Sequence, residues 1–116
     1  MEELRPTTEN KPWGSFREFV KNEAVTVKIL FVKSGEVFSL QKHHFREEFW
    51  RVLSGQPDIS IGDNTVKGKP GDEFKIPPET SHRIGAPIDD VEVLEISKGE
   101  FDENDIVRLE DKYGRA

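Results

Sequence analysis

The stretch from Gly35 to Gly55 reads GEVFSLQKHHFREEFWRVLSG, and the interpretation of the whole chain begins there. Gln41 and His43 are two residues apart in a run that favours β structure, so their side chains leave a strand on the same face. Glu48 follows after a short polar segment that we interpret as a hairpin turn. The spacing therefore predicts that an amide, an imidazole and a carboxylate come together.

A further imidazole, His82, follows the double proline Pro77-Pro78, about forty residues after His43. We predict that Gln41, His43, Glu48 and His82 form the coordination shell of one divalent cation. Their nitrogen and oxygen donors suit zinc, manganese, iron, cobalt or nickel, and the sequence does not choose among these metals. The alternative is that they are ordinary polar residues on a strand that faces water. The fixed offsets between turn glycines favour the metal site.

The composition limits the class of protein. A chain of 116 residues is long enough for one domain. The absence of cysteine excludes disulfides, thiolate zinc sites and cysteine nucleophiles. A net charge of −6 argues against nucleic acid or an anionic membrane as the main partner. No apolar run approaches the roughly 20 residues that span a bilayer, and the acidic start is not a signal peptide, so we expect a cytoplasmic protein.

Short β-favouring runs separated by Gly, Pro and Asp predict an all-β fold. The runs cover residues 24–32, 38–43, 49–53, 58–61, 65–66, 74–76, 81–84 and 91–97. This spacing is typical of an antiparallel sandwich or barrel. Polar residues on otherwise core-like faces favour a small barrel that encloses one ligand.

The two ends of the chain differ from this pattern. Residues 1–12 are polar and contain two prolines, so we predict an N-terminal tail or arm before a single domain of residues 13–116. Asp102 to Tyr113 is predicted to be a short helical segment. Asp102 would be its N-cap, and basic residues follow in its later turns.

The two blocks around the predicted ligands resemble those of the cupin superfamily. In that pattern His usually stands at the position of Gln41 and Gly at the position of Glu79. The first difference keeps a ligand through the amide carbonyl, and the second concerns the turn before His82. The resemblance implies a cupin double-stranded β-helix, which is a jelly-roll barrel.

A narrower resemblance covers residues 11–115. The matching segments are KPWGSFR (11–17), LQKHH (40–44) with Arg46, Glu48 and Trp50, Ile76-Pro77, His82-Arg83, DIVR (105–108), Glu110-Asp111 and Tyr113-Gly114-Arg115. They are similar to type II mannose-6-phosphate isomerase, the cupin module that is often fused behind a mannose-1-phosphate guanylyltransferase. Gln in place of the first cupin His is a feature of that family. Phe45 and Phe49 stand where the family commonly has His. Guanylyltransferase activity is not expected, because no phosphate-cradling Gly-rich loop occurs.

The resemblance implies metal-dependent interconversion of mannose 6-phosphate and fructose 6-phosphate through an enediol, with the metal as Lewis acid. Such a reaction needs a proton carrier and a phosphate clamp. Glu95, which shares strand parity with Val91 and Val93, and Glu48 are the candidates for the proton carrier. Lys28 and Arg108 are the candidates for the clamp. A salt bridge between Lys28 and Glu95 explains both residues equally well.

Three other cations, Lys42, Arg46 and Arg83, flank the predicted ligands. They are further candidates for the clamp, but the favoured interpretation of each is a solvated surface charge. His44 should point away from His43. Two other functions stay open: a non-catalytic cupin that binds a sugar or sugar phosphate, and a metal-dependent oxygenase. Gln41 disfavours the oxygenase, whose site more often has three His. A small sugar phosphate is the expected ligand, and we expect a homodimer paired through a sheet edge.

Overall fold

The computed structural model describes residues 4–100, 102 and 104–115, and the secondary structure of these residues is entirely β. The strands are β1 (Thr7–Lys11), β2 (Gly14–Glu18), β3 (Val25–Val32), β4 (Leu40–Lys42), β5 (Arg46–Ser54), β6 (Asp58–Ile61), β7 (Asn64–Lys67), β8 (Glu73–Ile76), β9 (His82–Gly85), β10 (Val91–Gly99) and β11 (Val107–Glu110). In this part of the chain no helix is present that could cross a bilayer. The all-β prediction is confirmed.

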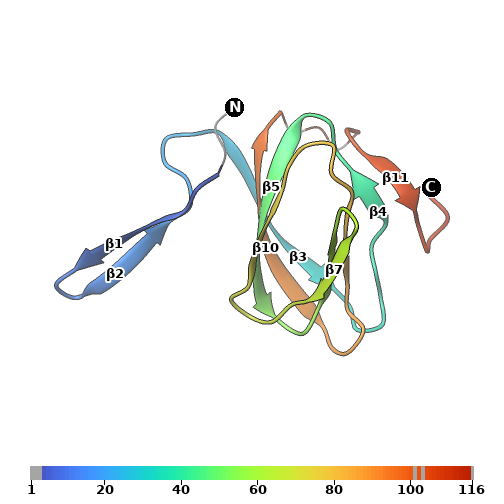
Figure 1. The fold of residues 1–116 in the computed structure, drawn as a ribbon, viewed down its shortest axis with the longest axis horizontal. Helices are drawn as coiled ribbons and strands as arrows, with labels where there is room; N and C mark the ends of the chain where they lie inside the picture. Colours follow the sequence, from blue (N-terminus) through green and yellow to red (C-terminus); the bar gives the residue numbers. More distant parts are fainter. Residues whose placement is uncertain (1–3, 101, 103, 116) are drawn as a thin grey trace.

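Two sheets form the body of the molecule (Figure 1). One has the strand order β3-β10-β5-β8 and the other β11-β4-β9-β6-β7, and all pairings are antiparallel. Among the described strands of these two sheets, only β6 and β7 form a hairpin of successive strands, and the other neighbours are far apart in sequence, so the sheets form mainly by crossovers. The result is the cupin-like jelly roll that the resemblance implied.

The apolar core fills the space between the two sheets. Alternate residues of β5 and β10 point inward, and Trp50, Val52 and Val93 are almost completely buried. Ile59 and Ile84 complete this core from the other sheet. At the β4–β9 end, the same inward faces carry polar side chains instead. The polar end of the core is therefore the candidate position of a functional site.

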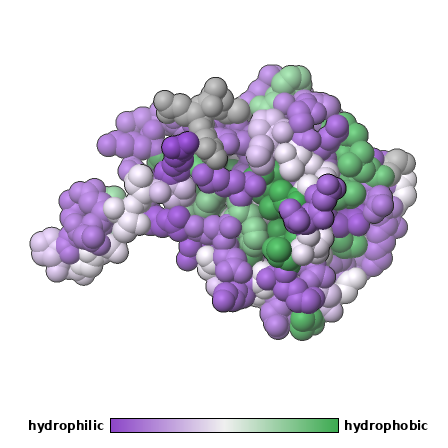
Figure 2. Space-filling model, viewed as in Figure 1, coloured by the Kyte–Doolittle hydropathy of each residue, from purple (hydrophilic) through white to green (hydrophobic). Residues whose placement is uncertain are grey.

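The N-terminal strands β1 and β2 form a separate hairpin, the arm, which projects from the body (Figure 1). The expected domain boundary at residue 13 falls in the turn of this hairpin. A second small cluster of Leu4, Phe49 and Ile96 anchors the base of the arm on the outer face of the first sheet. Figure 2 shows apolar surface gathered over the body, whereas the arm is mostly hydrophilic.

The predicted helix from Asp102 to Tyr113 is wrong. Asp102 does cap a turn, because its side chain accepts the Asn104 N–H and its carbonyl accepts the Asp105 N–H, both at 2.9 Å. The chain then enters β11, which pairs with the free edge of β4. A distant strand edge, not the local sequence, decides the conformation of this segment.

Candidate metal centre

Three of the four predicted ligands come together in the polar end of the barrel. His43 follows β4 directly, Glu48 lies on β5 and His82 begins β9. Their donor atoms all lie within 4.8 Å of one another, and all three residues are buried. His43 Nε2 is 3.2 Å from Glu48 Oε1, and His82 Nε2 is 3.8 Å from Glu48 Oε2. The carboxylate lies between the two imidazoles.

Backbone carbonyls orient both imidazoles. Nδ1 of His43 is 2.6 Å from the carbonyl oxygen of Asp105, and Nδ1 of His82 is 3.0 Å from that of Thr80. A carbonyl oxygen only accepts, so Nδ1 carries the proton and the Nε2 lone pair points toward Glu48. Burial lowers the pKa of His82, which keeps it neutral. This is the arrangement that metal-binding imidazoles need.

His82 Nε2 provides the test of whether a cation fits. It is buried and has no hydrogen-bond partner within the described part of the structure. A buried lone pair without a donor costs free energy, and a cation is a partner that removes this cost. The donor set of nitrogen and carboxylate oxygen suits a divalent transition metal or zinc. The residues present therefore fit a metal ion.

Gln41, the fourth predicted ligand, lies on β4 directly opposite His82 on β9. Directly paired residues of antiparallel strands place their side chains on the same face, so the two side chains share the inward face. The amide oxygen of Gln41 accepts a hydrogen bond from the Ser39 hydroxyl at 2.8 Å. Its second lone pair can serve as a ligand, as the sequence predicts.

Glu95 lies next to the cluster of three donors, and its carboxyl group can carry a proton. It is buried on β10, and Trp50 Nε1 donates to both carboxylates, at 3.1 Å to Glu48 and 3.2 Å to Glu95. Burial and the negative charge of Glu48 raise the pKa of Glu95 to about 8. Burial also acts to raise the pKa of Glu48, but the two imidazoles lower it to about 2. At neutral pH Glu95 is mostly protonated and Glu48 is ionised.

Arg46 is the residue that the sequence analysis misjudged. Its side chain is only 7% exposed, so the prediction of a solvated surface charge is wrong. Its Nε donates to Glu48 Oε1 at 3.2 Å, and its Nη2 lies 3.1 Å from His43 Nε2. Arg46 and Glu48 are two residues apart on β5 and therefore share a face, which is the signal that could have placed it in the site.

The two predicted phosphate-binding cations lie on opposite sheets. Lys28 on β3 is half-buried and directly opposite Glu95. The positive charge of Lys28 acts to lower the pKa of Glu95, but burial and Glu48 raise it by more. Arg108 on β11 is opposite Gln41, and its Nε is buried without a hydrogen-bond partner among the described residues. Both positions face the polar end of the barrel.

The remaining polar residues lie outside the cluster. His44 is exposed, and its Nδ1 is 2.6 Å from Glu79, which also pairs with Lys42 at 3.7 Å. Arg83 donates to the Phe38 carbonyl at 2.9 Å and to Glu110 at 3.3 Å. Glu79 has a φ of 66°, a left-handed conformation that glycine adopts more easily. The difference from the cupin pattern therefore falls on a strained turn.

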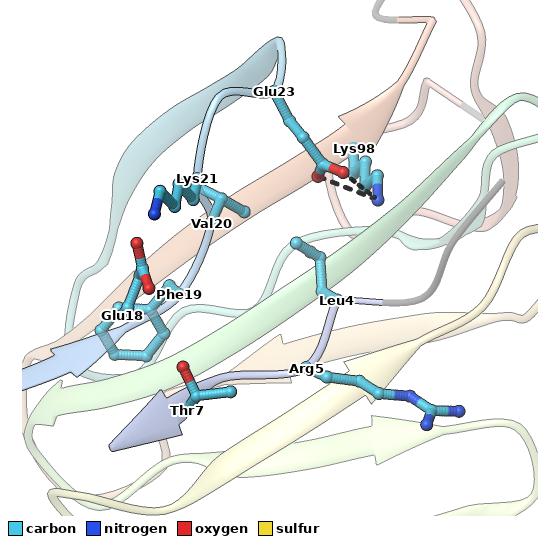
Figure 3. A pocket seen from close by; sticks show the side chains of 9 residues that line it. All are labelled: Leu4, Arg5, Thr7, Glu18, Phe19, Val20, Lys21, Glu23 and Lys98. Atoms are coloured by element: carbon cyan, nitrogen blue, oxygen red, sulfur yellow. Dashed lines mark hydrogen bonds and ion pairs between the residues drawn. The ribbon is translucent and has the colours of Figure 1, made fainter. Parts of the chain in front are cut away.

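A cavity of about 560 Å³ lies at the base of the arm and is separate from the metal cluster (Figure 3). Leu4, Phe19 and Val20 line it together with charged residues. The ion pair of Lys98 with Glu23, at 2.9 Å, closes one side. Two of the charged residues that line the cavity, Lys98 and Glu23, therefore already pair with each other. No residue of the metal cluster lines this cavity.

The fold and the buried His-Glu-His cluster define a cupin with a candidate metal centre. A solved cupin-like protein from Thermotoga maritima has the same fold, with a TM-score of 0.63 and 22% identity over 75% of this chain and 65% of that one. The family model described as mannose-6-phosphate isomerase C-terminal matches residues 2–111, and the chain belongs to this family.

Two relatives support the family assignment. The chain is 36% identical over 108 residues to the xanthan biosynthesis protein XanB of Xanthomonas campestris, and these residues are 91% of this chain. It is 35% identical over 105 residues to mannose-1-phosphate guanylyltransferase 2 of Escherichia coli O157:H7, and these residues are 89% of this chain. The chain spans only 23% and 22% of the lengths of these two proteins.

Proposed function

We propose that the protein is a metal-dependent sugar-phosphate isomerase that interconverts mannose 6-phosphate and fructose 6-phosphate. One observation carries the proposal: inward lone pairs of His43, Glu48 and His82 converge next to the protonated carboxyl of Glu95. Gln41 would complete the ligand set. The family to which the chain belongs supports the choice of substrate.

A bound divalent cation would supply Lewis acidity to the carbonyl and hydroxyl oxygens of the sugar at C1 and C2. Glu95 would move the proton between these carbons. Its pKa of about 8 leaves both protonation states populated near neutral pH, so the same carboxyl can accept and return a proton. Trp50 holds the Glu95 carboxyl in place through its indole N–H. Glu48 would then act as a metal ligand and not as the proton carrier.

Lys28 and Arg108 would bind the phosphate. Their positions opposite Glu95 and Gln41 put a cation on each sheet beside the polar end of the barrel. The buried Nε–H of Arg108 has no hydrogen-bond acceptor among the residues that the structure describes, and a guanidinium matches two phosphate oxygens at once. We expect Lys28→Met to weaken sugar-phosphate affinity with metal content unchanged.

A cupin that binds a sugar phosphate without turnover is the second candidate. The hydrogen bonds of Trp50 and Ser97 to Glu95 favour it, because they satisfy that carboxyl without any substrate. An oxygenase is less well supported, since the cluster offers only two imidazoles.

The proposal is tested by stripping the purified protein, reloading it with each of the five metals, and measuring fructose 6-phosphate formed from mannose 6-phosphate. Glu95→Gln should lower kcat at least about a hundredfold without changing metal content. Glu92→Gln, at an exposed position of the same strand, is the control. Absence of turnover with every metal rejects the isomerase, and binding of the sugar phosphate in that case supports the second candidate.

The ligand assignment is tested separately by metal content. Gln41→Ala and His82→Ala should each lower metal affinity at least about tenfold, since even residues behind the ligands often contribute that much. Full occupancy in both variants would contradict the proposed metal centre.

A further inference from the structure

Arg46 contacts two of the three side chains that the proposed metal would use. Its Nη2 lies 3.1 Å from Nε2 of His43, and its Nε lies 3.2 Å from Oε1 of Glu48. Nδ1 of His43 carries a proton because it faces a carbonyl oxygen. A guanidinium has only donors, so the Arg46 N–H donates to the Nε2 lone pair. Two of the three clustered residues, His43 and Glu48, thus have a cationic partner within the chain.

The position of Arg46 has a clear electrostatic reason. His43 Nε2 and Glu48 Oε1 are 3.2 Å apart, and the Arg46 guanidinium lies within hydrogen-bond distance of both. Glu48 is almost fully buried and needs a countercharge. Arg46 provides this countercharge, and the carbonyl of Asp102 accepts a hydrogen bond from its Nη1 at 3.3 Å, which holds the guanidinium in place.

We propose that Arg46 and the divalent cation compete for His43 and Glu48, so that metal uptake is an exchange in which the guanidinium leaves these two side chains. This inference rests on the metal centre of the proposed function. A nitrogen lone pair serves either an N–H donor or a metal ion, but not both. The positive charge of Arg46 also opposes the approach of a second cation. Arg46 therefore stabilises the site before binding and weakens metal affinity.

The test compares Mn²⁺ and Zn²⁺ affinity of the EDTA-stripped wild type and Arg46→Met by calorimetric titration. We expect the variant to bind each metal at least about tenfold more tightly, because no charge-assisted hydrogen bonds are broken on binding. Without metal its melting temperature should fall below that of the wild type, and saturating metal should close most of this gap. A metal that binds the variant more tightly also stabilises it more than it stabilises the wild type at the same metal concentration.

Arg51→Met is the matched control. Arg51 lies on the same strand but binds Glu73 at 2.7 Å on the outer face, so its loss should leave metal affinity unchanged. Arg46→Gln also removes the charge but keeps a polar side chain, and its metal affinity is measured instead if Arg46→Met does not fold. Equal or weaker metal affinity in both Arg46 variants would overturn the competition. Absence of metal binding in the wild type and every variant would overturn the metal centre itself.

Discussion

Trp50 connects the two carboxylates of the site through one indole N–H. The ring is fully buried, and its Nε1 reaches Glu48 and Glu95 at 3.1 and 3.2 Å. The same ring packs edge-on against His82, with 5.4 Å between the ring centroids. A single apolar core residue therefore fixes the distance between the proposed metal ligand and the proposed proton carrier.

Glu73 is the residue at which pH should act on the arm. Its carboxylate accepts hydrogen bonds from Arg17 of the arm and from Arg51 of the body. Partial burial raises the pKa of Glu73, but these two hydrogen bonds outweigh burial, and the net pKa is lowered. A lowered folded-state pKa means that the stabilisation is complete above the unfolded value of 4.5 and is lost as pH falls through the folded value.

We therefore expect Glu73→Gln to lower the free energy of unfolding by about 0.5–1.5 kcal/mol at pH 7. The difference from the wild type should shrink toward zero as the pH falls below 4.5 and through the lowered pKa of Glu73. Urea denaturation at a series of pH values measures it. Glu92→Gln, at an exposed position, is the control. A difference that stays constant down to the lowest pH would show that the carboxylate charge is not involved.

The sequence predicted the residues of the cluster better than their surroundings. His43, Glu48 and His82 could be predicted because their offsets from turn glycines and a proline are local. Arg46 shares strand parity with Glu48, which indicates an inward position, but the Asp102 carbonyl that holds its guanidinium lies on a distant turn that no local pattern reports. The acceptors of the two imidazoles are backbone carbonyls, which every residue has, so the sequence could not identify them.

At the scale of strands, alternation and turn residues predicted most elements. The run 58–61 is β6, and the run 91–97 lies within β10, because these strands are bordered by strong turn residues. The 38–43 run is shortened to β4, which pairs with β9 only at Gln41 and His82. The C-terminal error has the opposite cause: β11 depends on pairing with β4, which no local pattern reports.

Gly55 ends β5 in a conformation that other residues rarely adopt. Its φ is +85°, and an added Cβ would lie 2.3 Å from the carbonyl oxygen of Asp90. Gly55→Ala should lower the free energy of unfolding by about 2–5 kcal/mol, from the left-handed backbone and the clash together. Denaturant titration measures this loss.

Gly62→Ala separates the two contributions. Gly62 also has a positive φ, +59°, but an added Cβ would meet nothing within 4 Å. It should therefore cost only the backbone part, about 1–2 kcal/mol. Equal losses at the two glycines would contradict the predicted clash at Gly55.

At the scale of the whole molecule, the arm and the edge strand β3 each expose apolar side chains. The arm exposes Trp13 and Phe16, at 74% and 40%. The edge strand β3 exposes Val27, Ile29 and Phe31 on its outer face, at 56–58%. An isolated two-stranded hairpin is marginal in water, and an apolar edge strand invites pairing. Both features agree with our expectation of a homodimer.

We expect the wild type to sediment as a dimer and the double variant Ile29→Lys with Phe31→Lys to sediment as a monomer. Charges at these positions would be buried in the interface without partners. Ile88→Lys, at a loop position with 57% exposure, should leave the dimer intact. A wild type that is monomeric at tens of micromolar would contradict the expectation, as would a double variant that stays dimeric.

The acceptors that orient His43 and His82 are main-chain oxygens of Asp105 and Thr80. Substitution of Thr80 changes a side chain that does not supply the oxygen facing His82. The Asp105 carboxylate, by contrast, also accepts the N–H groups of His44 and Phe45, at 2.9 and 3.0 Å, so this side chain helps to fix the backbone that carries the oxygen facing His43. The orientation of each ring follows from the path of the backbone, and a deletion or insertion in either loop would alter that path. Selection should therefore act on the length of both loops and on the residue at position 105.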